Sequence, residues 1–146
     1  MENSKKLLIL AVVIILVVSS VIVTIFVIDF ARDGVDHKSG IFTLDFQSKG
    51  SDSWTFSAQS AQGYSIIFRD LSQEDLNKIS VESSIAEGEM FLILSQDENS
   101  QSIDLSEGTM KLSSKDMGMD AFNPGRISMQ LKFNNAKNLA ANISWH

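Results

Sequence analysis

Cysteine is absent from the 146-residue chain, and proline occurs only once, at Pro124. Without cysteine the chain can form no disulfide, expose no reactive thiolate and carry no lipid on an N-terminal cysteine. The fold must therefore be held together by its hydrophobic core alone. Pro124 lies between Asn123 and Gly125, a combination typical of a tight turn, so it interrupts no expected strand.

Histidine is almost as scarce, because the chain has only His37 and His146. Neither lies within an expected strand, so a histidine-based triad and a three-histidine metal site are not expected. The motifs of serine hydrolases, zinc proteases, phosphate loops and calcium loops are also missing from the sequence. Acid pairs such as Glu87 and Glu89 fall at expected turns, where charge is solvated. The sequence therefore predicts a protein that is not an enzyme and that needs no cofactor and no metal.

Charge is absent from residues 7–28, a run dominated by Leu, Ile and Val. A helix of that length spans roughly 33 Å, close to the hydrocarbon thickness of a bilayer. Lys5 and Lys6 precede the run, which predicts a cytoplasmic tail over residues 1–6 and an extracytoplasmic location for the rest. A cleaved signal peptide is the alternative, but its apolar region is usually about 7–15 residues long and ends at a small-x-small site. The pattern favours an uncleaved signal-anchor in the plasma membrane, and thus a single-pass protein in contact with the lipid bilayer.

The part of the chain after this run is acidic. Residues 29–146 carry 17 Asp and Glu against 10 Lys and Arg, a net charge of −7. Nucleic acid is therefore not expected as a partner, because no basic patch is present. Residues 29–40 combine charge with Gly34 and Gly40 and show no periodicity, so they are expected to be a linker. About a hundred residues then remain, enough for one hydrophobic core over residues 41–146.

From Ile41 onward the apolar residues alternate with polar ones, as in β-strands with one buried face. Short strands separated by Gly, Asn, Asp and Ser turns predict an all-β, antiparallel β-sandwich or jelly roll of about eight or nine strands. Ser72 and Asp75 have the spacing of a capping box, which predicts a short helix over 72–78. The expected strands cover residues 41–46, 54–58, 61–70, 79–86, 89–96, 101–106, 109–113, 125–133 and 139–145.

The alternation also predicts which side chains face inward. Phe42, Leu44 and Phe46 share one face of their strand, as do Tyr64, Ile66 and Phe68 of theirs. The most regular strand has Ile127, Met129, Leu131 and Phe133 on one face, and Arg126, Ser128, Gln130 and Lys132 on the other. These apolar faces are expected to meet in the core.

Residues 64–145 carry a family resemblance. The segments YSIIFRD, EGEMFLILSQ, IDLSEG and FNPGRISMQLKFNNAKNLAANISW occur in that order. In this order they resemble small membrane-anchored or lipoprotein-like extracytoplasmic β-sandwich proteins of Gram-positive bacteria, which are mostly uncharacterised. The resemblance implies a place in the cell envelope, on the outer side of the plasma membrane, and carries over no catalytic residue.

The loop over residues 114–125 is the longest irregular segment and the first candidate for a binding surface. It contains Met117, Met119 and Phe122, apolar residues that no expected strand buries. Its oxygen-bearing residues and its Met-x-Met pair are also conceivable ligands for calcium or copper(I), but a solvated loop with packed methionines is the favoured interpretation. Trp54 and Tyr64 are further candidates, because exposed aromatic rings stack on sugars, although their alternation favours the core.

These observations predict a membrane-anchored, extracytoplasmic, non-enzymatic binding or interaction module of the cell envelope. Its partner would be an envelope protein or a glycan. A carbohydrate-binding module for cell-wall glycan is one alternative. A pilin-like or filament-anchoring subunit is another, since such proteins join an N-terminal apolar helix to a β-sandwich.

Overall fold

The computed structural model describes residues 36–146. The cytoplasmic tail, the membrane span and residues 29–35 of the expected linker lie outside this part. Within residues 36–146 no helix has the length and apolar character needed to cross a membrane. Eight strands, a short helix and a 3₁₀ turn make up this part: β1 (His37–Thr43), β2 (Phe46–Lys49), β3 (Ser53–Leu71), α2 (Gln73–Lys78), β4 (Ser80–Ser84), β5 (Glu87–Gln96), β6 (Asn99–Asp104), β7 (Thr109–Ser113), η1 (Met119–Ala121) and β8 (Gly125–Ser144).

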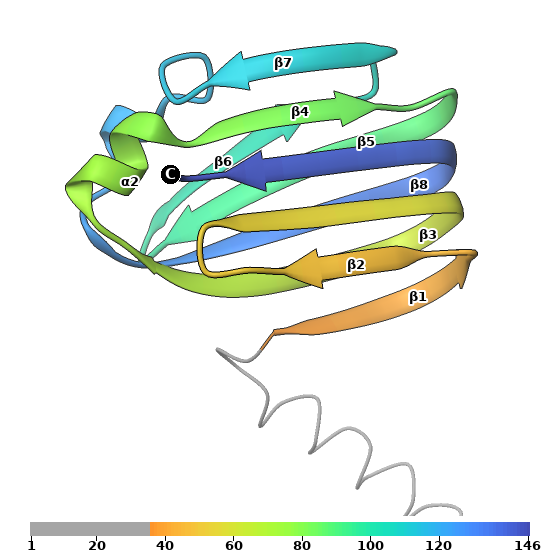
Figure 1. Cartoon of the computed structure of the whole chain (residues 1–146), viewed down its shortest axis with the longest axis horizontal. Helices are drawn as coiled ribbons and strands as arrows, with labels where there is room; N and C mark the ends of the chain where they lie inside the picture. The colour runs from red at the N-terminus through yellow and green to blue at the C-terminus, as the bar shows by residue number, and fades with distance from the viewer. Residues whose placement is uncertain (1–35) are drawn as a thin grey trace, which may run out of the picture. The chain divides into compact units, whose positions relative to one another are not determined.

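All strand pairs are antiparallel and belong to one hydrogen-bonded sheet, which is folded into two layers (Figure 1). The front layer has the order β2-β3-β8-β4-β7, and the back layer has the order β1-β3-β8-β5-β6. The long strands β3 and β8 stay paired with each other and pass together from one layer to the other. The expected all-β, antiparallel fold is confirmed.

The passage between the layers is a bend within continuous strands. The register of β3 against β8 shifts between Ala61 and Gly63, and Gly63 has a φ of +122°. Asn135 and Asn138 of β8 have positive φ as well, which Asn tolerates better than most residues. The two strands expected over 54–58 and 61–70 are therefore one strand, β3. Those expected over 125–133 and 139–145 are likewise one strand, β8.

The core lies between the two layers. The inward faces predicted for β8 are confirmed, because Ile127, Met129, Leu131 and Phe133 are all buried. Phe133 of the back layer stacks on Phe56 of the front layer with ring centroids 4.8 Å apart. This contact joins the two layers beside the bend, since Phe133 pairs with Gly63, and it is a favourable arrangement of two rings.

The N-terminal strand differs from the expectation. β1 begins at His37, so residues 37–40 are strand and not linker. The strand expected over 41–46 is interrupted at Leu44, which has a φ of +46°. Leu44 and Phe46 therefore do not share the inward face with Phe42: they are 81% and 62% exposed, while Phe42 packs against the core.

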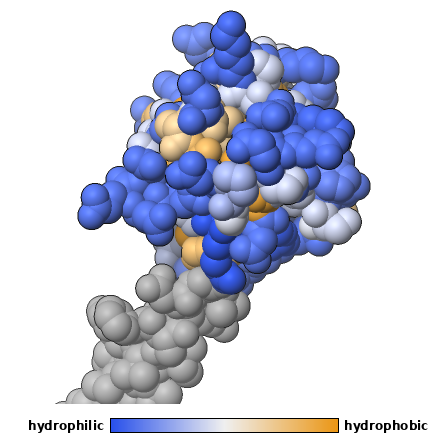
Figure 2. Space-filling view, turned by 90° about the vertical axis from the view of Figure 1, so that its left-hand side faces the viewer, coloured by the Kyte–Doolittle hydropathy of each residue, from blue (hydrophilic) through white to orange (hydrophobic). Residues whose placement is uncertain are grey.

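The short helix α2 follows β3 at one end of the sandwich (Figure 1). Its predicted capping box is confirmed, because the Asp75 N–H donates to Ser72 Oγ (3.2 Å) and the Ser72 N–H donates to Asp75 Oδ2 (2.8 Å). These bonds satisfy two backbone donors near the helix start. Figure 2 views the molecule from this end, where the surface is mainly hydrophilic with small apolar areas.

Candidate functional site

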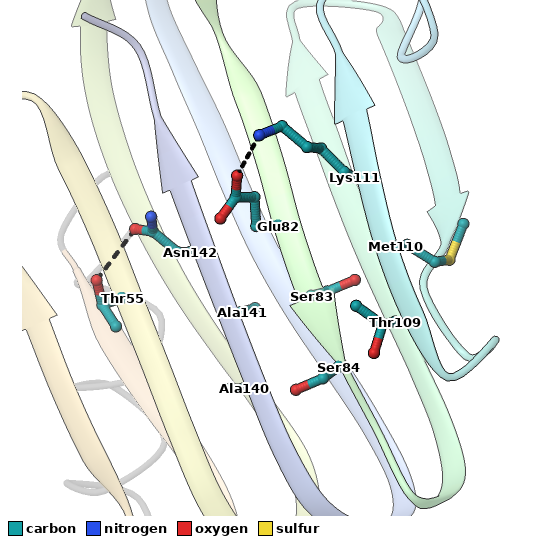
Figure 3. A pocket seen from close by; sticks show the side chains of 10 residues that line it. All are labelled: Thr55, Glu82, Ser83, Ser84, Thr109, Met110, Lys111, Ala140, Ala141 and Asn142. Atoms are coloured by element: carbon teal, nitrogen blue, oxygen red, sulfur yellow. Dashed lines mark hydrogen bonds and ion pairs between the residues drawn. The ribbon is translucent and has the colours of Figure 1, made fainter.

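A shallow groove of about 390 Å³ lies on the front layer (Figure 3). It crosses β3, β8, β4 and β7, so its lining comes from four strands that are far apart in the sequence. Most of the lining side chains occupy the solvent-facing positions of these strands. The lining residues are Thr55, Glu82, Ser83, Ser84, Thr109, Met110, Lys111, Ala140, Ala141 and Asn142.

Four polar side chains form one row across the strands. Thr55 lies opposite Asn142, Asn142 opposite Glu82, and Glu82 opposite Lys111. Residues directly opposite each other in antiparallel strands place their side chains on the same face, about 5 Å apart. The row therefore runs over the whole width from β3 to β7.

The row contains two bonded pairs, both drawn in Figure 3. Thr55 Oγ1 donates to Asn142 Oδ1 at 3.1 Å, which leaves the amide hydrogens of Asn142 for a ligand. Lys111 Nζ and Glu82 Oε1 form an ion pair at 2.6 Å. The hydrogen bond with Glu82 and the charge of Glu82 raise the pKa of Lys111, so Lys111 is charged at neutral pH.

A second row, two residues further along, consists of small side chains. Ala140 of β8 lies opposite Ser84 of β4, and Ser84 opposite Thr109 of β7. Small residues leave room for a ligand to approach the sheet closely, and the hydroxyls can donate or accept hydrogen bonds. The surface of the groove is mainly apolar, with hydroxyl and amide groups and one internally neutralised ion pair around it. This combination suits an uncharged ligand that has both apolar and hydroxyl-bearing faces.

The loop expected to be a binding surface is instead part of the core. Met117, Met119 and Phe122 are 1%, 3% and 3% exposed, so the expectation of an exposed apolar loop is wrong. The loop is held against the sandwich from two sides. Gln101 of β6 donates from Nε2 to the Gly118 carbonyl (3.2 Å), and Ser114 donates to the Asn77 carbonyl at the end of α2 (2.8 Å). Burial of the three apolar side chains in this lid is favourable and removes them from partners.

Met119 and Phe122 nevertheless border a second depression. This depression also measures about 390 Å³ and lies between α2 and the loop. Its remaining lining is mostly polar, and the exposed parts of the two apolar side chains are small. It offers no apolar anchor for a partner protein.

The two aromatic candidates lie on different sides of the sheet. Trp54 is fully buried in the core, so it is no binding-surface residue. Tyr64 was expected on the inward face, but the inward positions at this part of β3 are Ser65 and Ile67, both fully buried. Tyr64 is half-buried on the outer face of the back layer, where its hydroxyl lies 3.2 Å from His37 Nε2. The five candidate residues therefore form no common site.

The part of the chain described here also contains no group of three or more His, Cys, Asp or Glu side chains placed to hold a metal. Asp116, considered as a calcium ligand, instead accepts from the Ser113 N–H (2.8 Å) and the Ser113 hydroxyl (2.6 Å). These two hydrogen bonds lower the pKa of Asp116 and stabilise the start of the loop.

The groove residues carry little signal in the sequence. Thr55, Glu82, Lys111 and Asn142 each occupy an ordinary polar position of an alternating strand. Which strands are neighbours, and in which register, decides that these side chains meet. That information is non-local, because Thr55 and Asn142 are 87 positions apart.

No family model and no curated protein matches this chain. Among solved structures, it is similar to PliG of Salmonella Typhimurium, a periplasmic lysozyme inhibitor of g-type lysozyme, with 17% identity, 66% of this chain and 92% of that chain covered, and a TM-score of 0.36. It is also similar to a mutant of a carbohydrate binding module of family 29, with 10% identity, coverage of 75% and 77%, and a TM-score of 0.37. A xylanase of Cellvibrio japonicus in complex with xylopentaose shows 9% identity and the same TM-score, with 75% of this chain and 26% of that chain covered. Likenesses at these scores carry no inference about function.

Proposed function

We propose that this chain is a membrane-anchored, extracytoplasmic binding module that is not an enzyme and that holds an envelope glycan in the groove of the front layer. The observation that carries the proposal is the groove itself. It joins solvent-facing polar side chains of four strands around a floor of small residues.

The anchor is argued from the sequence. Residues 7–28 carry no charge and are long enough for a helix to cross the hydrocarbon region, and Lys5 and Lys6 favour the cytoplasm for the preceding tail. The binding domain then lies in the cell envelope, on the outer side of the plasma membrane. The domain contains no thiol, and its two histidines lie at His37 and His146, away from the groove. Binding is the activity for which it is equipped.

The ligand class is argued from the chemistry of the lining. Sugar hydroxyls donate and accept hydrogen bonds, and the groove presents the hydroxyls of Thr55, Ser84 and Thr109 and the amide of Asn142. The ion pair of Glu82 and Lys111 contributes no net charge. A neutral polyhydroxylated ligand therefore fits better than a nucleic acid or another polyanion.

The test fills the groove and leaves the rest of the surface unchanged. Ala140 is exposed on the groove floor, so Ala140→Trp occupies the space that a ligand would use. The matched control is Ser102→Trp, at an exposed position of β6 in the back layer. Full-length protein in detergent is mixed with purified insoluble cell-wall glycan, sedimented, and the bound fraction is measured against glycan concentration.

We expect wild type and Ser102→Trp to bind alike, and Ala140→Trp to bind about tenfold or more weakly, equivalent to about 1.4 kcal/mol. Equal binding by all three proteins would place the ligand elsewhere. If none binds glycan, but wild type captures an envelope protein from solubilised membranes and Ala140→Trp does not, the groove is a protein-binding site and the glycan assignment is wrong.

The anchor has its own test. Protease added to intact cells should digest the domain, and the mature protein should begin at or near Met1. A mature N-terminus beyond residue 25 would indicate a cleaved signal peptide and a secreted protein.

A further inference from the structure

Three large apolar side chains of residues 36–146 are exposed, and all three lie within six consecutive residues. Ile41 is 76% exposed, Leu44 81% and Phe46 62%. Single exposed apolar residues are ordinary, whereas a group of them in one place marks a surface that contacts something. We call these three residues the apolar corner.

The apolar corner lies on the edge of the sheet formed by β1 and β2, the first two strands of the described chain. β1 and β2 both pair with the same side of β3, β1 in the back layer and β2 in the front layer. Leu44 is in the turn between them: β1 ends opposite Ser60 and β2 begins opposite Ser57, close to the register shift at which β3 bends. Both are edge strands of their layers, so no further strand of the described chain pairs beyond them (Figure 1).

The charges along this edge are paired. Lys38 forms an ion pair with Asp45, directly beside Leu44. Asp36 accepts from the Phe68 N–H (2.8 Å) and from Arg69 Nη1 (2.9 Å), and Lys49 is 4.0 Å away. Although burial acts to raise the pKa of Asp36, these hydrogen bonds and the charges of Arg69 and Lys49 lower it overall. Despite its net charge of −7, the extracytoplasmic part presents an edge here whose carboxylates are locally neutralised.

Chain length limits what can cover the corner. Seven residues, 29–35, separate Ile28, the last of the apolar run, from Asp36, where the fold begins, and they give eight residue-to-residue steps between the two. Fully extended, they reach at most about 29 Å. β1 has seven residues and is about 23 Å long, so the corner at its far end remains within reach of the bilayer. A surface tethered this closely is present at high effective concentration, unlike a second copy of the chain, which must first be encountered.

We infer that the apolar corner rests in the interfacial region of the bilayer to which the chain is anchored, an inference that relies on the proposed anchor. Leu, Ile and Phe gain from transfer into that region in proportion to the apolar area they bury. The contact orients the domain with the β1–β2 edge toward the lipid. Lys111 and β7 then lie at the opposite edge of the front layer, roughly 19 Å further out at about 4.8 Å per strand. The groove, on the face between these two edges, is thereby held beside the sheet and clear of the lipid.

The test uses a unique fluorescent label, because the chain has no cysteine of its own. Thr43→Cys places an environment-sensitive dye beside the corner at an exposed position and leaves the three apolar residues intact. Glu98→Cys, in the exposed turn between β5 and β6, is the matched control. Both full-length proteins are reconstituted in phospholipid vesicles, and flotation confirms their insertion.

Docking predicts that the dye at position 43 emits at shorter wavelength than the dye at 98, is shielded from aqueous iodide, and is quenched by quencher lipids. The triple variant Ile41→Thr, Leu44→Asn and Phe46→Thr should abolish all three differences. Its folding is protected, because Thr suits a strand and Asn suits the positive φ of Leu44. Unfolding midpoints of the variant and wild type in detergent check this.

Three results would overturn the inference. The first is that, in inserted protein, the dye at position 43 behaves like the dye at position 98. The second is that the shielding of the dye at position 43 appears only as the protein-to-lipid ratio rises, which would indicate contact with a second copy of the chain. The third is that the triple variant keeps the shielding. Phe46 and the groove-floor residue Ala140 both lie opposite Ser57, on either side of it. A fourth result that would overturn the inference is therefore that Phe46→Thr alone weakens glycan binding while the dye at position 43 stays exposed, which would assign Phe46 to the groove. Each of these leaves the groove proposal standing, since that depends on Ala140→Trp.

Discussion

Gly63 is the residue on which the bend of β3 depends most directly. Its φ of +122° lies in a region that side chains with a Cβ rarely adopt. A Cβ added there would lie 2.2 Å from the Ser39 carbonyl oxygen and 2.7 Å from the Gly40 Cα. Both neighbours are backbone atoms of β1, so Gly63→Ala cannot be accommodated by rotating a side chain. We expect β1 to move away from β3 at this point.

The size of the effect follows from two contributions. A non-glycine residue in so sparsely populated a conformation costs about 1–3 kcal/mol. Forcing extra atoms into a packed site costs about 1–3 kcal/mol more. Together they predict a loss of about 2–6 kcal/mol for Gly63→Ala, a large part of the total stability of about 5–15 kcal/mol that a domain of this size has.

Gly108 provides the matched control. It also has a positive φ, +52°, but an added Cβ would meet no atom within 4 Å. Gly108→Ala therefore carries only the conformational strain, about 1–2 kcal/mol, partly offset by the reduced freedom of the unfolded chain. The two variants separate steric clash from backbone strain.

The assay is urea unfolding followed by tryptophan fluorescence, because Trp54 and Trp145 are both buried and report on the core. Gly63→Ala should lower the unfolding free energy by about 1–3 kcal/mol more than Gly108→Ala, with a similar dependence on urea concentration. If the two variants lie within about 0.5 kcal/mol of each other, the close approach of β1 and β3 at Gly63 does not determine stability. The account of the bend would then be wrong.

Three further outcomes can be measured in the same way. Phe122→Ser should destabilise the fold by about 3–5 kcal/mol, because Phe122 is 3% exposed. At a temperature low enough for the variant to stay folded, its binding of glycan in the groove should be unchanged. An unchanged unfolding midpoint would mean that the loop is an exposed binding surface after all. Ser83→Ala should stabilise by about 1 kcal/mol, because the buried Ser83 Oγ has no hydrogen-bond partner among the described residues, and a loss of stability would reveal one. The backbone carbonyl of Trp145 and the nearby charge of Asp75 raise the pKa of His146. The stabilising contribution of His146 should therefore be complete below about pH 6.5 and be lost as the pH rises through the higher folded-state pKa. A difference in stability between wild type and His146→Gln that does not change with pH would contradict this.

The features that depend on local sequence were predictable. The alternation over 125–133 identified the inward face of β8, and the spacing of Ser72 and Asp75 identified the start of α2. In both cases the determining contacts lie within a few residues of each other. Local periodicity and capping are therefore sufficient evidence for such elements.

The continuity of the long strands was not predictable in the same way. Gly63 and the pair Asn134 and Asn135 look like turn residues, because they permit backbone conformations that turns require. β3 and β8 nevertheless stay paired along almost their full lengths, so the partner strand supplies the hydrogen bonds that would otherwise end at a turn. Turn chemistry thus produces a bend wherever a neighbouring strand bends with it.

The bend also explains why Trp54 and Tyr64 do not lie on one face of the sheet. In β3 the buried positions are even-numbered as far as Ala58 and odd-numbered from Ala61 onward, so the inward face changes by one residue. A shift of one residue moves every later side chain to the opposite face. Trp54 before the shift therefore faces the core, while Tyr64 after it faces outward, and the two cannot form one aromatic platform.

The same reasoning applies to the N-terminal edge, with the opposite result. Phe42, Leu44 and Phe46 alternate as a buried face should, and a straight strand would bury all three. The positive φ of Leu44 breaks the alternation after Phe42, so Phe42 packs on the core while Leu44 and Phe46 turn outward. A pattern that predicts core thus yields exposed apolar residues close to a membrane-length apolar run, which is why the bilayer is the partner to test first at this edge.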